Sequence, residues 1–82
     1  MKLVVVKFAD PTTFGHWAAM EDVDTSQIRV CVAAGWLVEE NDKYVKVALL
    51  LSKDKNEANS WIIIPGGCVL SMDEIKEVDW DA

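Results

Sequence analysis

The chain has 82 residues, of which 51% are hydrophobic, and its formal net charge is −6. This length supports one small domain with a limited core, so association with further copies would add stability. The acidic balance argues against direct binding of nucleic acid, which uses clustered Lys and Arg. No stretch is long and apolar enough to span a membrane, and Lys7 interrupts the only apolar run that could begin a secretory signal. We therefore expect a cytoplasmic protein.

The first predicted strand covers residues 3–8, which are rich in β-branched side chains, and Pro11 follows its end. Thr12 or Thr13 could then cap a short helix over residues 15–21. This helix would place Trp17 and Met20 on one side and would lie across one end of the sheet as a lid.

A long β-hairpin over residues 28–51 is the centre of the predicted fold. A two-residue turn at Asn41 and Asp42 would pair Trp36 with Val47 and direct one set of alternating side chains to the core. That set is Val32, Ala34, Trp36, Val38, Val45, Val47, Leu49 and Leu51. Gly35 lies inside the long second strand, where a glycine permits a sharp bend or a bulge.

The rest of the chain predicts two further strands and an acidic end. Residues 52–60 have the polar composition of an exposed connection, and residues 61–64 read as a buried strand that stops at Pro65. Residues 68–72 form a last short strand. The predicted domain is residues 1–72, and residues 73–82 are an acidic C-terminal tail whose first part could also be strand end or helical turn.

These elements together predict a mainly β fold, a small five-stranded antiparallel barrel of the SH3-like or Sm-like kind with one short helix after strand 1. Several short strands with tight turns favour a small barrel over a sandwich or an α/β layer. The Pro-Gly-Gly link at residues 65–67 fits the one-turn step between the last two strands of such barrels.

Three segments carry a resemblance to known proteins: residues 35–40 (GWLVEE), residues 44–50 and residues 64–69 (IPGGCV). This layout resembles a group of short, mostly uncharacterised phage and bacterial proteins with a GWLV and IPxGC pattern. The resemblance implies a small Sm-like or SH3-like barrel and a viral accessory role in the host cytoplasm. It also implies assembly into rings, since Sm-like relatives commonly associate through their edge strands.

The sequence offers little catalytic chemistry. His16 is the only histidine, and no motif of a nucleophile, a phosphate loop or a metal site surrounds it. Cys31 and Cys68 lack CxxC spacing and predict buried free thiols, with a disulfide or a metal site as the alternative. We therefore expect no enzyme activity, no catalytic residue, no bound metal and no cofactor.

Five residues are candidates for ligand binding: His16, Trp17, Arg29, Tyr44 and Lys46. The first two could stack on and hydrogen-bond to a flat base under the lid, and the cations could pair with an anionic ligand. The structural alternatives are an exposed loop histidine beside a core tryptophan and a solvated sheet face. Trp61 and Trp80 are candidates for an interface, because exposed indoles are typical of contacts between proteins.

The sequence thus predicts a non-enzymatic, homo-oligomeric binding protein. As a viral accessory protein it would sequester a small nucleotide-like ligand or block a host protein, using pockets at its subunit seams. The alternative is an acidic decoy that binds a host nucleic-acid-binding protein through residues 73–82.

Overall fold

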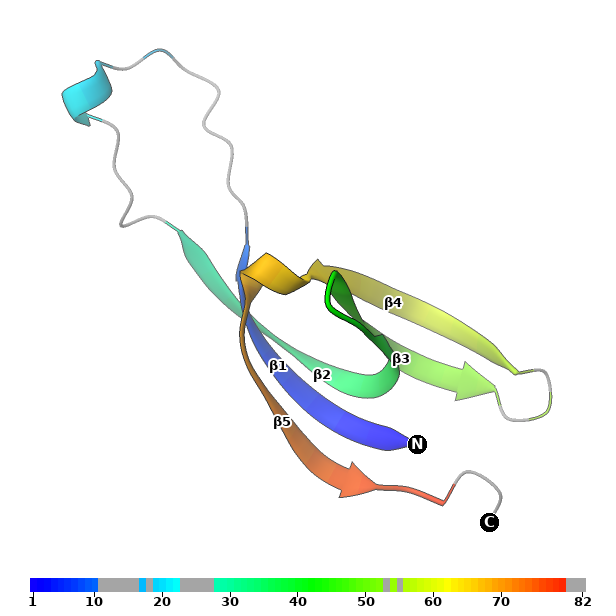
Figure 1. Cartoon of the computed structure of the whole chain (residues 1–82). Coiled ribbons are helices and arrows are strands. Elements are labelled where there is room, and N and C mark those ends of the chain that lie inside the picture. Colours follow the sequence, from blue (N-terminus) through cyan, green and yellow to red (C-terminus); the bar gives the residue numbers. More distant parts are fainter. Residues whose placement is uncertain (11–16, 18, 23–27, 53, 55, 80–82) are drawn as a thin grey trace.

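The computed structural model describes residues 1–10, 17, 19–22, 28–52, 54 and 56–79. These residues form one antiparallel sheet with the strand order β4-β3-β2-β1-β5 (Figure 1). The strands are β1 (Lys2–Asp10), β2 (Arg29–Glu40), β3 (Tyr44–Ser52), β4 (Glu57–Pro65) and β5 (Val69–Glu77), and the 3-10 turns are η1 (Met20–Asp22) and η3 (Gly66–Cys68).

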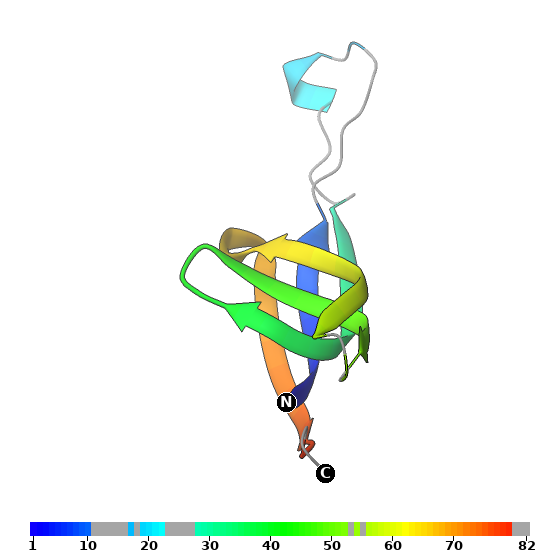
Figure 2. The ribbon, with the colours of Figure 1, turned by 90° about the vertical axis from the view of Figure 1, so that its right-hand side faces the viewer.

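The sheet folds over itself because β2 takes part in both of its halves. β2 pairs with β1 from Arg29 to Trp36 and with β3 from Trp36 to Glu40. Figure 2 shows β3 and β4 running across β1 and β5 as a second layer. Burial of apolar side chains between the two layers forms the core, which is made of Val4, Val6, Val45, Val47 and Ile64.

The prediction of five antiparallel strands is confirmed, whereas the prediction of a closed barrel is wrong. β4 and β5 lie at opposite ends of the strand order and have no register pairs with each other in the described part of the chain. A barrel closes only when its first and last strands hydrogen-bond. Here η3 carries the chain from β4 to β5 without joining the two strands, and the sheet stays open.

The predicted short helix with its lid position is not found. Within the described part of residues 15–21 only the 3-10 turn η1 begins, and it lies beyond the ends of β1 and β2, away from the sheet (Figure 1). Trp17 is fully exposed and Met20 is nearly so, so neither side chain packs on the sheet. Short helices depend on such packing for their stability, which explains why the helical pattern alone fails here.

The predicted core face is correct for the first half of β3 and wrong for β2 and for Leu49. Val45 and Val47 are buried as expected, but Leu49 is 62% and Val32 65% exposed. In β2, Ala33 and Leu37 pack against the core instead. The physical reason in β2 is an irregularity in the β2–β3 register between Leu37 and Glu39. A bulge at this point inserts one extra residue and reverses which side chains face inward along the rest of the strand.

The hairpin turn itself lies one residue later than predicted. The backbone N–H of Asn41 donates to the carbonyl oxygen of Tyr44, which leaves Asp42 and Lys43 as the loop. The Asn41 side-chain oxygen accepts hydrogen bonds from the backbone N–H groups of Lys43 and Tyr44, both at 2.9 Å. This is the local bonding for which asparagine is favoured in turns.

The last two strands are longer than predicted. β4 begins at Glu57 because Ala58 and Asn59 pair with Leu51 and Leu50, although their composition is that of a polar connection. β5 continues to Glu77, so that the acidic segment beginning at residue 73 starts inside the sheet and pairs with β1. Strand pairing has overridden the local composition at both places.

Candidate functional site

Two of the predicted ligand-binding residues, Tyr44 and Lys46, lie together at the start of β3. Strand alternation puts both on the outer face, opposite to the side chains of Val45 and Val47 in the core. The Lys46 Nζ atom lies 5.5 Å from the centroid of the Tyr44 ring. Glu39 is the register partner of Lys46 on β2 and joins the two into one cluster.

Glu39 is the anionic centre of this cluster. The Tyr44 hydroxyl donates a hydrogen bond to Glu39 Oε1, and Lys46 Nζ lies 3.2 Å from the same oxygen. Both hydrogen bonds hold the pKa of Glu39 below its ordinary value of 4.5, and the bond from Tyr44 has the larger effect. The carboxylate is therefore ionised and occupied by its own neighbours, which suits a stabilising contact of the hairpin and not a general base.

We expect the replacement Tyr44→Phe to raise the pKa of Glu39 toward 4.5, because it removes the donor with the largest effect. The measurement is an NMR titration of the Glu39 carboxyl carbon. In the natural chain, these bonds stabilise the fold at pH values above the pKa that Glu39 has in the unfolded chain. This stabilisation is lost as the pH falls through the lower pKa of Glu39 in the folded chain. Lys43→Met is the control, since Lys43 is an exposed residue of the same hairpin; an equal rise in that variant would contradict the assignment.

The other predicted ligand-binding residues do not join this cluster. Arg29 is the first residue of β2 and Tyr44 is the first residue of β3, which follows the other end of β2 (Figure 1). Alternation puts Arg29 on the other face of the sheet. Trp17, three residues before the start of η1, is fully exposed. His16 lies outside the described residues. A single small molecule bound to one chain cannot contact Arg29, Tyr44 and Lys46 together.

A second feature of the outer face is a row of apolar side chains across four strands. In register, Leu3 faces Trp36, Trp36 faces Ala48, and Ala48 faces Trp61. Residues directly opposite each other in a sheet share a face, so both indoles flank Ala48, which has no exposed surface. We call Leu3, Trp36, Ala48 and Trp61 the tryptophan row.

The outer end of the tryptophan row is open to solvent. Trp61 is 58% exposed on β4, and Ile63, which shares its face, is also exposed. The prediction of Trp61 as an interface residue is thus compatible with its position, while Trp80 lies outside the described residues. The sequence did not reveal the row, because its alignment depends on the bulge after Leu37.

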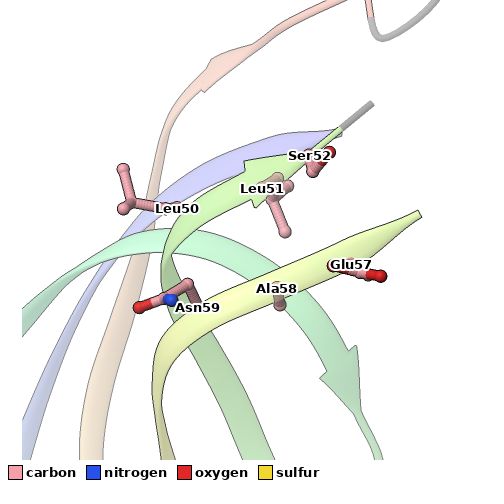
Figure 3. Close-up of a pocket in the computed structure, with 6 residues that line it drawn as sticks. All are labelled: Leu50, Leu51, Ser52, Glu57, Ala58 and Asn59. Atoms are coloured by element: carbon pink, nitrogen blue, oxygen red, sulfur yellow. The ribbon is translucent and has the colours of Figure 1, made fainter. Parts of the chain in front are cut away.

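The hairpin of β3 and β4 also carries a hollow of about 430 Å³, shown in Figure 3. Its lining residues are Leu50, Leu51, Ser52, Glu57, Ala58 and Asn59. Register pairing divides them between the two faces of the hairpin, with Leu51 and Ala58 on one and the remaining four on the other. Their side chains do not converge on one point, so this hollow lacks the polar convergence of a binding site.

The described residues contain no group of three or more His, Cys, Asp and Glu side chains arranged to hold a metal ion. Cys31 and Cys68 are free and half-buried. Among the segments that the structure describes, no helix has the length and apolar character needed to cross a membrane.

No family model matches the chain, and no curated protein or solved structure is detectably similar to it. The resemblance to short phage and bacterial proteins therefore stays a prediction. The most distinctive part of the surface of this chain is the outer face with the tryptophan row.

Proposed function

We propose that this protein is a non-enzymatic binding protein that works as a homo-oligomer. The observation that carries the proposal is its apolar surface. The described residues bury six hydrophobic side chains and expose thirteen large ones, among them Trp61, Ile63, Val30 and Val32. Neighbouring exposed apolar side chains, such as Trp61 and Ile63 on one face of β4, are typical of surfaces that contact another protein.

We also propose a class of ligand and a relationship to small β-barrels. The strand order and η3 support a relationship to SH3-like or Sm-like proteins in an opened form. A nucleotide-like ligand or a host protein would bind at a seam between subunits, where the Tyr44 ring and Lys46 of one chain could be completed by a neighbour. The placement of Arg29 away from this pair favours a shared site over one within a single chain.

The alternative of an acidic decoy is less well supported. Glu74 lies 3.6 Å from Lys2 Nζ, and Glu77 lies 3.1 Å from the amino group of Met1. These pairs offset part of the negative charge that a decoy would present to a basic partner. Exposed pairs of this kind are weak, but they reduce the local field.

The proposal is tested by the mass of the protein in solution. We expect light scattering to give a multiple of 9.2 kDa for the natural chain and to give a lower mass for Trp61→Lys, because a buried ammonium opposes association. Ile75→Lys is the matched control, since Ile75 and Trp61 are both 58% exposed and the charge change is the same. A natural chain that stays at 9.2 kDa at every concentration would refute the proposal.

A further inference from the structure

β4 is an edge strand whose residues 61–64 lack the usual protection against pairing. It ends the strand order and, within the described part of the chain, has register pairs only with β3. Ser60, with a φ of 57°, interrupts the regular strand before this stretch, and residues 61–64 contain no charged side chain and no proline. Trp61, Ile62 and Ile63 are all exposed. Such an edge presents unpaired backbone N–H and C=O groups beside apolar side chains, and a further β-strand satisfies both.

β5, the opposite edge of the sheet, is protected. Its register with β1 is irregular between Leu3 and Val4 and again between Lys7 and Phe8. Its second half carries the charged side chains of Asp73, Glu74, Lys76 and Glu77. Bulges and charges are the devices by which edge strands resist the addition of another strand. A second copy therefore offers β4, and not β5, as the partner for an exposed β4.

We propose that two copies of the chain pair through antiparallel β4 strands and form a two-fold symmetric dimer with a continuous ten-stranded sheet. This inference rests on the proposed homo-oligomeric function and specifies its interface. An interface of this type uses the same surface on both subunits, so it closes at two copies.

Symmetry restricts the register of this interface. Opposite residues in a sheet share a face, so some residue of β4 must lie opposite its own copy. Placing Ile62 on the axis puts Trp61 opposite the partner subunit's Ile63, which matches exposed apolar side chains on the outer face. Because Ile63 is the register partner of Lys46, each tryptophan row would run into the partner's Ile63 and lie two residues along the strand from the partner's tryptophan row. Pro65, which has no N–H to donate, falls at the periphery opposite the partner's Asn59.

A disulfide formed between two copies of a single introduced cysteine distinguishes this interface from others. We expect Ile62→Cys, in a full-length chain that also carries Cys31→Ala and Cys68→Ala, to form a covalent dimer of twice 9.2 kDa under mild oxidation. Opposed residues of antiparallel strands lie about 4.5–5.5 Å apart at Cα, within the range of a disulfide. Ile75→Cys in the same background is the control. The side chain of Ile75 is 58% exposed and that of Ile62 is 39% exposed, so random collisions would form more disulfide at position 75.

The outcomes separate this inference from the proposed function. An oligomeric mass without a covalent dimer of Ile62→Cys would overturn the β4–β4 interface and leave homo-oligomerisation standing, whereas a monomeric mass would refute both. In a variant carrying both Ile62→Cys and Ile75→Cys, peptide mapping that found the disulfides mainly between positions 62 and 75 would show head-to-tail pairing and would also overturn it. Should Ile62→Cys fail to fold, spin labels on Ser60→Cys test the same axis, since the backbones at residue 60 would lie on the order of 14 Å apart; a much longer distance contradicts the proposal.

Discussion

Replacement of Gly35 by alanine is expected to lower the free energy of unfolding by about 3 kcal/mol, because the added methyl group has no space. A Cβ atom at Gly35 would lie 2.4 Å from the backbone oxygen of Ala48 and 3.0 Å from Cγ1 of Val47. The oxygen belongs to the β3 backbone, so it cannot move without disturbing the pairing of β2 and β3. Urea denaturation followed by far-UV circular dichroism measures the change.

Gly67→Ala is the control for this prediction. A Cβ atom at Gly67 meets no atom within 4 Å, so we expect its stability to stay within about 0.5 kcal/mol of the natural chain. The two variants make the same chemical change, and both glycines have negative φ angles. Equal stabilities for Gly35→Ala and Gly67→Ala would show that β3 does not approach β2 as closely as the structure has it.

Replacement of Ile64 by alanine is expected to cost about 3–4 kcal/mol, because it removes three methyl or methylene carbons from the core. Ile64 is one of the largest fully buried side chains and packs with Val45 and Val47 from the neighbouring strand. Small domains have little stability to spare, so we expect this variant to be largely unfolded at physiological temperature. Thermal unfolding at a fixed protein concentration is the measurement, since association changes the apparent midpoint.

Ile75→Ala is the matched control for Ile64→Ala. It deletes the same atoms from a side chain that is 58% exposed on β5. We expect its cost to be below about 1 kcal/mol. A cost for Ile75→Ala that equals the cost for Ile64→Ala would mean that the core is not where the packing of β1, β3 and β4 places it.

The sequence was sufficient to predict most of the strands but not the face that each strand presents. β-branched residues marked β1, and the polar turn between two apolar runs marked the hairpin of β2 and β3. β2 is apolar on both faces, from Val30 to Val38, so alternation alone could not choose between them. The choice is made by the bulge after Leu37, which depends on contacts with β3 and has no local signal such as a glycine.

The candidate site was predictable only in part, for the same reason. Tyr44 and Lys46 are two residues apart on one strand, so alternation alone put them together. Their third member, Glu39, comes from β2 and is aligned with Lys46 by the bulged register. The exposed edge of β4 was missed because a closed barrel was expected, and closure would have covered it. An open edge is a property of the whole sheet and cannot be predicted from the nine residues of β4 alone.

The bulge at Val38 also governs how the chain tolerates changes in length. Val38 is the extra residue, because Glu39 faces Lys46 and Leu37 faces the next residue of β3, Val47. Removing Val38 would leave a regular ladder in which Leu37 and Ala33 still face the core. The strand can therefore lose one amino acid at this point without changing which side chains meet the interior, and deletion of Val38 is expected to be mild.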